Sequence, residues 1–166
     1  MTEPETSQTV AFNPLKDIGR LPVNETSELR IYVDEFKGFP FGSIRTFVKR
    51  DNYEGPTKAG VTLKGQVLDG VIETLEKLPS EPTAVEEVEL ARFAKKPGVE
   101  LVVRVTIYRD TTGIDLREWV DEETYKGWSK KGVRINYADV AKTVGCLKEM
   151  RTFLAARPAK KAVKKA

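Results

Sequence analysis

The sequence contains no histidine and a single cysteine, Cys146, among its 166 residues. Histidine is the commonest general base, and histidine and cysteine are the usual ligands of zinc, so their scarcity argues against both kinds of site. Cys146 has no partner for an internal disulfide. Because it lies in an apolar helical pattern, we interpret it as a packed small residue rather than a reactive thiol. We expect no metal and no cofactor.

Long hydrophobic runs are also absent. No stretch reaches the ~18 apolar residues of a membrane-spanning helix, and the polar, acidic N-terminus does not resemble a secretory signal. We expect no membrane association. If the source is prokaryotic or a phage, we expect a cytoplasmic protein associated with the nucleoid. If the source is eukaryotic, we expect a nuclear protein.

Signatures of catalysis are missing too. The acidic residues fall in predicted turns without the clustering that a metal-dependent nuclease needs, and Asp121–Glu123 is typical of a solvated loop. There is no glycine-rich phosphate loop and no nucleophile elbow. We therefore expect a protein that is not an enzyme.

Excess charge of one sign is confined to one end of the chain. The formal net charge is +3, yet residues 157–166 carry five basic residues and no acid, which leaves the rest slightly acidic. A basic surface on the body must then come from segregation of charge. We interpret residues 157–166 as a disordered basic tail of the kind that binds nucleic acids.

What the chain does contain is a regular order of patterns. Residues 1–16 are polar with two prolines, which predicts a disordered segment. From residue 17, four stretches of period-two alternation precede a helical stripe of apolar residues that Pro79 ends. The acidic, proline-containing residues 79–88 are typical of a linker.

The same order recurs after the linker. A shift of 72 residues aligns 17–78 with 89–150 without a gap, with twelve identities in 62 positions, and the second helical stripe runs on to about residue 156. A single register over four strands and a helix indicates tandem duplication, and two repeats are too few for a solenoid. We predict an α+β fold of two β-β-β-β-α repeats, residues 17–78 and 89–156. Each would form a curved antiparallel sheet with a helix, and the two would pair as an intramolecular pseudo-dimer.

One face of each predicted sheet combines arginines with aromatic rings. Arg117 and Trp119 alternate with apolar residues along one strand, and Arg45 and Phe47 hold the same positions in the first repeat. Arginine beside an aromatic ring is common where proteins hold unstacked bases. The candidate binding residues are Arg20, Phe36, Lys37, Arg45, Phe47 and Lys58 in the first repeat, and Arg92, Arg104, Tyr108, Arg117, Trp119, Lys130, Lys131 and Arg134 in the second.

A structural interpretation stands beside this functional one. Aromatic residues favour strands, and an arginine beside them can simply cover apolar surface. Tyr53 and Tyr125 fit loop anchors as well as base platforms, and Trp128 has no aromatic counterpart because Pro56 replaces it.

The second repeat also carries a recognisable motif. Residues 114–119, Ile-Asp-Leu-Arg-Glu-Trp, followed by residues 130–135, Lys-Lys-Gly-Val-Arg-Ile, resemble the signature of the transcriptional coactivator positive cofactor four family and its bacterial and phage relatives. Residues 36–38, 43–47 and 58–63 give a weaker version. A chain with two such units is also similar to the whirly single-stranded-DNA-binding proteins.

The resemblance implies a dimer through helices and a channel for single-stranded DNA without sequence preference. It implies roles for the strand-three Arg45 and Arg117 and for the aromatic residue that follows each. Because the hairpin of the second repeat has lost its Lys-Gly pair and Ala59 stands where the second repeat has Lys131, we expect unequal halves with the second the stronger.

The expected partner is single-stranded DNA, with RNA, duplex DNA and further self-association left open. Two alternatives remain at this point: a transcription or recombination adaptor whose sheet binds a protein, and an RNA or duplex-DNA binder in which the lysine tail dominates.

Overall fold

The computed structural model describes residues 8–83 and 86–157. These residues form two sheets and two helices, which confirms the α+β class. The first sheet has the order β1-β5-β4-β3-β2, in which β1 is parallel to β5 and the other pairs are antiparallel. Its strands are β1 (Gln8–Thr9), β2 (Lys16–Asn24), β3 (Ser27–Phe36), β4 (Phe39–Arg50) and β5 (Tyr53–Leu63).

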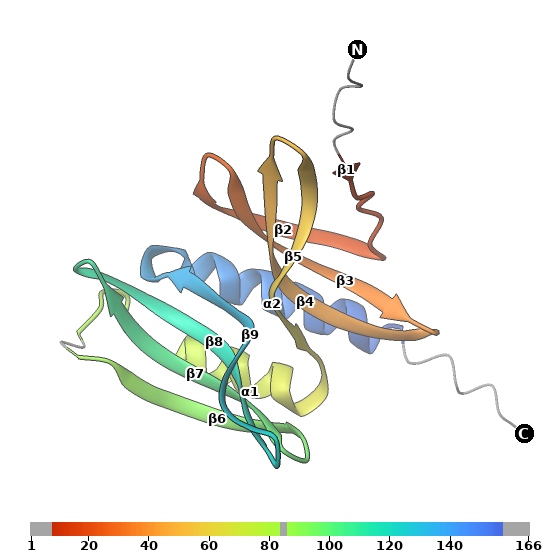
Figure 1. The fold of residues 1–166 in the computed structure, drawn as a ribbon. Helices are drawn as coiled ribbons and strands as arrows, with labels where there is room; N and C mark the ends of the chain where they lie inside the picture. Colours follow the sequence, from red (N-terminus) through yellow and green to blue (C-terminus); the bar gives the residue numbers. More distant parts are fainter. Residues whose placement is uncertain (1–7, 84–85, 158–166) are drawn as a thin grey trace, which may run out of the picture.

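The second sheet is an antiparallel meander of order β6-β7-β8-β9. Figure 1 shows the two sheets as separate curved layers, with the helices running behind their strands. These elements are β6 (Val88–Lys96), β7 (Val99–Tyr108), β8 (Thr111–Glu122), β9 (Tyr125–Asn136), the short 3-10 helix η1 (Tyr137–Asp139), α1 (Gly65–Glu76) and α2 (Val140–Ala155).

Strand pairing in the two sheets follows the same register at a shift of 72. The irregularity at Asp17/Gly19 returns at Glu89/Ala91, and that at Arg45/Phe47 returns at Arg117/Trp119. The hairpins between β3 and β4 and between β7 and β8 also agree, since both central residues of each turn have positive φ: Lys37 55°, Gly38 85°, Arg109 51° and Asp110 62°. Such turns match the twist of paired strands. The tandem duplication that the sequence predicts is one interpretation of these matching registers and turns.

Each helix packs against the sheet built by the other half of the chain. The aromatic ring of Phe93 on β6 lies over Gly70 of α1, and Met150 of α2 lies over Gly42 of β4. The helices also contact each other, and a single core joins both sheets and both helices. This exchange buries the apolar faces of both sheets in one layer, which leaves the opposite faces of the sheets outermost.

Expectations about the N-terminal segment and about the linker need correction. Residues 8–16 are ordered: Gln8–Thr9 pair with β5, and β2 begins at Lys16 rather than Asp17. The expectation of disorder is therefore wrong for this part of residues 1–16, while residues 1–7 lie outside the described part. β6 begins at Val88, inside the expected linker.

Two further expectations concern the basic tail and membrane association. The basic tail from residue 158 onward lies outside the described residues. Among the residues that the structure covers, no helix is long and apolar enough to span a membrane.

Candidate nucleic-acid interface

The outer faces of the two sheets carry the predicted arginine–aromatic pairs. On β4, Arg45 and Phe47 point away from the helices, and on β8 Arg117 and Trp119 do the same. The alternation read from the sequence is thus confirmed, since Ile114 and Leu116 are fully buried on the opposite face. The strand order places the outer residues of neighbouring strands side by side.

Each of these arginines lies over a glycine and secures a bulge. The Arg45 guanidinium donates to the Thr57 carbonyl at 2.9 Å, and a Cβ built on Gly60 would lie 2.7 Å from its Cζ atom. Arg117 repeats both contacts, with Ser129 at 3.4 Å and Gly132 at 2.6 Å. The two glycines are therefore explained by the close approach of an arginine, since neither has a positive φ.

The bulges bring lysines to the surface. Thr57–Ala59 of β5 lie opposite Thr46 alone, and Ser129–Lys131 of β9 lie opposite Glu118 alone, so each strand carries two extra residues. Lys58, Lys130 and Lys131 are exposed and form no ion pair within residues 8–83 and 86–157. A bulge that re-aims side chains is frequent next to functional sites.

A tyrosine anchors each bulge. Tyr53 donates its hydroxyl to the Pro56 carbonyl and Tyr125 to the Trp128 carbonyl, each at 2.6 Å. The anchoring interpretation of these two residues is confirmed by these bonds.

On the first sheet the expected aromatic platform is covered. Phe47 is only 5% exposed, so the expectation that its ring faces solvent is wrong. The ring of Phe12 packs edge-on against Tyr32 and Phe47 with centroids 5.1 and 5.2 Å away. The Arg30 guanidinium lies 4.2 Å from the Phe47 centroid and 4.7 Å from that of Phe12. The physical reason is that the segment before β2 crosses the sheet and places an aromatic ring on it.

On the second sheet the aromatic cluster is built from the strands themselves. Trp119 and Trp128 meet edge to face with centroids 4.9 Å apart, and the Arg104 guanidinium lies 4.4 Å from the Trp128 ring. Trp119 and Trp128 are paired across β8 and β9, as Phe47 and Pro56 are across β4 and β5. Both rings remain partly exposed. The second sheet therefore presents aromatic surface where the first sheet hides it.

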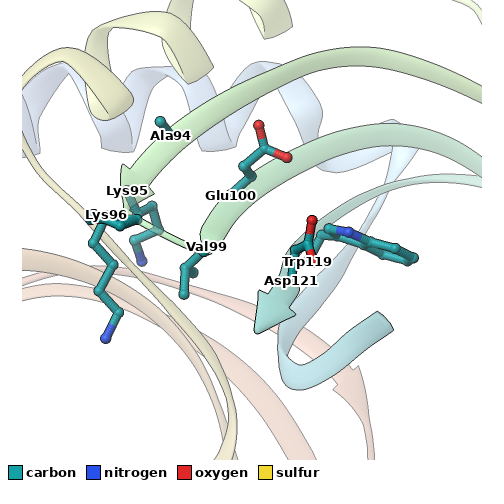
Figure 2. A pocket seen from close by; sticks show the side chains of 9 residues that line it. Ala94, Lys95, Lys96, Val99, Glu100, Trp119 and Asp121 are labelled. Carbon is teal, nitrogen blue, oxygen red and sulfur yellow. The ribbon is translucent and has the colours of Figure 1, made fainter. Parts of the chain in front are cut away.

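A groove of about 650 Å³ opens beside Trp119 (Figure 2). The β6–β7 turn forms one wall, with Lys95, Lys96 and Glu100. A smaller groove of about 190 Å³ lies at the corresponding place on the first sheet, between the β2–β3 turn and Phe47. Most residues that line the two grooves correspond at the 72-residue shift. The two sheets therefore carry a groove at the same place, and the groove of the second sheet is the larger one.

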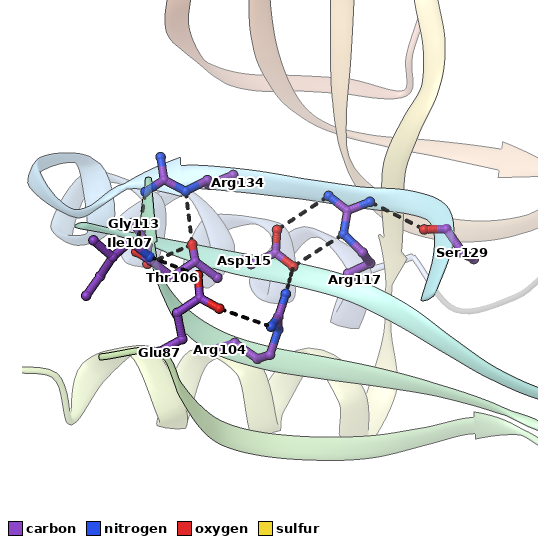
Figure 3. Close-up of polar contacts among 9 residues, drawn as sticks. All are labelled: Glu87, Arg104, Thr106, Ile107, Gly113, Asp115, Arg117, Ser129 and Arg134. Atoms are coloured by element: carbon purple, nitrogen blue, oxygen red, sulfur yellow. Dashed lines mark hydrogen bonds and ion pairs between the residues drawn. The ribbon is translucent and has the colours of Figure 1, made fainter. Parts of the chain in front are cut away.

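Arginines of the second sheet take part in two polar groups, one around Asp115 and one around Thr106 (Figure 3). Asp115, 4% exposed, accepts from Arg117 at 3.3 Å and pairs with Arg104 at 3.5 Å. Arg134 donates to the Thr106 hydroxyl at 2.9 Å and to the Thr111 carbonyl at 2.7 Å. These contacts fix the three arginines in place, and Asp115 neutralises part of the charge of Arg104 and Arg117.

Arg20 and Arg92, the predicted first-strand cations, are also paired. Arg92 bonds Glu89 and Glu100, each at 2.9 Å, and Arg20 pairs with Asp17 and Glu28 at the same positions. The hydrogen bond from Arg92 holds the pKa of Glu89 below its ordinary value. The carboxylates of Glu89 and then Glu100 raise the pKa of Arg92 further. The outer faces are therefore mixed in charge rather than uniformly basic.

The hairpin tips project the most exposed aromatic rings of the candidate set. Phe36 is 66% and Tyr108 60% exposed. Lys37 lies 5.3 Å from the Phe36 centroid, and Arg109 lies 5.2 Å from that of Tyr108. The loss of the Lys-Gly pair in the second hairpin thus leaves the ring–cation contact in place.

Sequence reasoning missed three residues of this interface. Phe12 lay in a segment expected to be disordered, although Val10, Ala11 and Phe12 form a small apolar run within it that signals packing. Arg30 was overlooked because Val102 takes its place in the second half. Trp128 was left open for want of an aromatic counterpart, and its contacts with Trp119 and Arg104 now place it in the cluster.

Residues 23–73 match the family model of the transcriptional coactivator p15 (PC4). The match covers about a third of the chain, from the end of β2 into α1, and so falls on the half in which the sequence motif was the weaker. The second half lies outside the matched range. No curated protein matches the chain.

Proposed function

We propose that the protein binds single-stranded DNA without sequence preference along the outer faces of its two sheets, in transcription, replication or recombination. One observation carries the proposal. An arginine–aromatic pair, a lysine-bearing bulge and an aromatic hairpin tip with a cation beside it occur on both sheets at the same register.

The chemistry of these groups fits a single strand. Exposed rings stack on unpaired bases whatever their identity, with about 1–3 kcal/mol per base, which makes recognition tolerant of sequence. Lys58, Lys130 and Lys131 supply charge for phosphates beside the rings. A duplex keeps its bases stacked and offers the rings nothing comparable.

The match of residues 23–73 to a transcriptional coactivator family supports a DNA-binding role in transcription. The family is named for a coactivator and not for a catalytic activity. Among the described residues there is no cluster of metal-ligating side chains. We infer that the protein acts by binding and does not catalyse a reaction.

The two halves act together as an intramolecular pseudo-dimer in this proposal. The exchange of helices between halves and the matching strand registers support it. The two sheets then offer two unequal platforms. The second is the stronger because Trp119 and Trp128 are partly exposed beside the larger groove.

The hairpin rings give the cleanest test because they contribute little to the core. Phe36→Ala and Tyr108→Ala each remove one exposed ring, and we expect each to weaken binding of oligo(dT) by about five- to a hundredfold, since one base loses its stacking partner. Fluorescence anisotropy gives the affinity, and thermal unfolding shows that the fold is kept. Phe47→Ala is unsuitable, because it would also open a cavity in a buried cluster.

Phe153→Leu removes a ring from the helix layer and should leave affinity unchanged. Equal affinities for wild type and both hairpin variants would refute the stacking model. Gel shifts with single-stranded DNA, duplex DNA and RNA at two salt concentrations decide the ligand. Preference for duplex DNA, or for RNA, would replace the proposed one.

A further inference from the structure

The segment that crosses the first sheet occupies the place of a base. We propose that residues Gln8–Pro14 are a displaceable strap that holds the side chain of Phe12 on the first sheet's platform and leaves when a single strand binds there. The inference rests on the proposed function. It means that the second sheet is open in the free protein, whereas the first is closed by its own chain.

The ring of Phe12 sits where a nucleobase would stack. It packs against Tyr32 and Phe47, and two guanidinium groups face it, with Arg30 4.7 Å and Arg20 5.6 Å from its centroid. Aromatic rings and guanidinium planes are the groups that proteins place around unstacked bases.

The strap meets only half of the chemistry of this site. Residues 8–14 contain no charged side chain, so the strap itself offers Arg20 and Arg30 a ring but no anion, and the carboxylates that pair with these arginines are Asp17 and Glu28 of the sheet. A single strand brings both a base and a phosphate to the same cations. A nucleic acid therefore offers these arginines a phosphate that the strap lacks, and this phosphate competes with Glu28 for them.

The strap is also weakly held. β1 has two residues, against nine to twelve in the other strands. Besides the ladder between β1 and β5, the Gln8 amide donates to the Asn52 carbonyl at 3.2 Å and the Val10 amide to the Glu54 carbonyl at 2.8 Å. Gln8, Thr9, Val10 and Ala11 are all exposed. Short, exposed terminal elements open at low cost compared with the core.

The second sheet provides the contrast. There the ring beside Trp119 is Trp128, which belongs to β9 and cannot leave without breaking the sheet. The first sheet has Pro56 at that position, and Phe12 fills the space from outside the sheet. An aromatic group held by a separable segment can be exchanged for another aromatic group.

The first arm of the test removes the ring. Phe12→Ala in the full chain should bind oligo(dT) about three- to tenfold more tightly than wild type, because affinity is reduced by the fraction of molecules in which the site is closed. Val88→Ala, which trims an exposed apolar residue at the corresponding edge of the second sheet, is the matched control and should not change affinity. Unchanged or weaker binding by Phe12→Ala would mean that Phe12 is a permanent part of the platform and would overturn the proposal.

The second arm locks the strap. Thr9 and Glu54 are paired across β1 and β5, where Cα atoms lie about 4.8 Å apart, within the range that a disulfide spans. Thr9→Cys with Glu54→Cys, in a Cys146→Ser background, should bind more weakly when oxidised than when reduced. Equal affinity in both states would contradict a strap that must leave.

Hydrogen exchange reports on the strap directly. Adding oligo(dT) to wild-type protein should deprotect the Val10 amide, whereas retained protection at saturation would overturn displacement. If wild type binds and Phe12→Ala is no tighter, the strap fails and the proposed function stands. If neither binds any single strand, both fail. Binding by Phe12→Ala alone would support the strap but would contradict an open second platform in the proposed function.

Discussion

At the scale of single residues, the arginines named on the outer faces already have partners. Asp115 joins Arg104 and Arg117, and Arg92 lies between Glu89 and Glu100. Because the pKa of Glu89 is lowered in the fold, its pairing contributes stability above its unfolded pKa and is lost as pH falls through the lowered value. At neutral pH a phosphate must therefore compete with these carboxylates for the arginines.

Glu100→Gln tests this competition. Glu100 pairs with Arg92 and faces Trp119 across β7 and β8, so its charge opposes a phosphate at the larger groove. We expect oligo(dT) to bind about two- to fivefold more tightly at low salt, in keeping with the small energies of exposed ion pairs. Glu73→Gln makes the same charge change on α1 and should have no such effect. A loss of affinity in Glu100→Gln would show that the carboxylate positions Arg92 for binding.

The environment of Cys146 bears on whether its side chain is a packed residue or a reactive thiol. Its side chain is half-buried, with its sulfur beside Gly19, and burial raises the pKa of the thiol. A raised pKa disfavours the reactive thiolate. The interpretation as a packed small residue agrees with these facts, although the burial is only partial.

At the scale of elements, the helices depend on close approach to strands from the other half. α1 contains Gly70, over which the Phe93 ring lies so closely that an added Cβ would be 2.4 Å from a ring carbon. Glycine weakens a helix by about 1 kcal/mol relative to alanine, so this position gives up helix propensity to let β6 approach. Gly145 in α2 has no atom within 4 Å of such a Cβ.

The two glycines form a matched pair for a stability test. Gly70→Ala should lower the free energy of unfolding by about 1–3 kcal/mol, since the overpacking against Phe93 outweighs the gain in helix propensity. Gly145→Ala should raise it by up to about 1 kcal/mol for propensity alone. Urea unfolding followed by circular dichroism measures both. Stabilisation by Gly70→Ala would mean that α1 and β6 are less tightly packed than this structure has them.

At the scale of the whole molecule, one core supports two outward-facing sheets. The helices pack between the halves, and the apolar faces of both sheets join a single cluster. Each sheet buries its apolar face with the helix of the other half, which makes the outer faces of both halves dependent on the entire chain. A strand long enough to reach both sheets would gain from both platforms at once.

We expect the basic tail to add to the affinity for single-stranded DNA independently of either sheet. Truncation after Arg157 removes four lysines, which we expect to act through counterion release. The dependence of log affinity on log salt for oligo(dT) should become shallower by up to about 3, from about 0.7 per phosphate contact on single strands. An unchanged slope would assign the lysines to another role.

Much of the fold could be predicted from the pattern of residues. Period-two alternation gives the strands, Pro79 ends the first helical stripe, and the 72-residue shift predicts that Arg45 and Arg117 hold equivalent places, as the strand registers show. These features depend on local spacing, which a sequence contains. The candidate residues on strands and hairpin tips were found for the same reason, and their role in binding stays a prediction.

What the sequence by itself determined is therefore the α+β class, four strands and a helix in each half, and the alternation that places Arg45 and Arg117 on the outer faces. Only the tertiary structure decided which faces are open. Phe12 covers Phe47 on the outer face of the first sheet, and α1 covers the inner face of the second sheet. Both contacts join residues far apart in the chain, so local spacing does not predict them. Period and propensity describe neighbours along the chain, whereas coverage depends on where a distant segment returns. The first sheet is closed and the second is open because Pro56 leaves a space that a separate segment fills, while Trp128 fills the corresponding space from within its own strand.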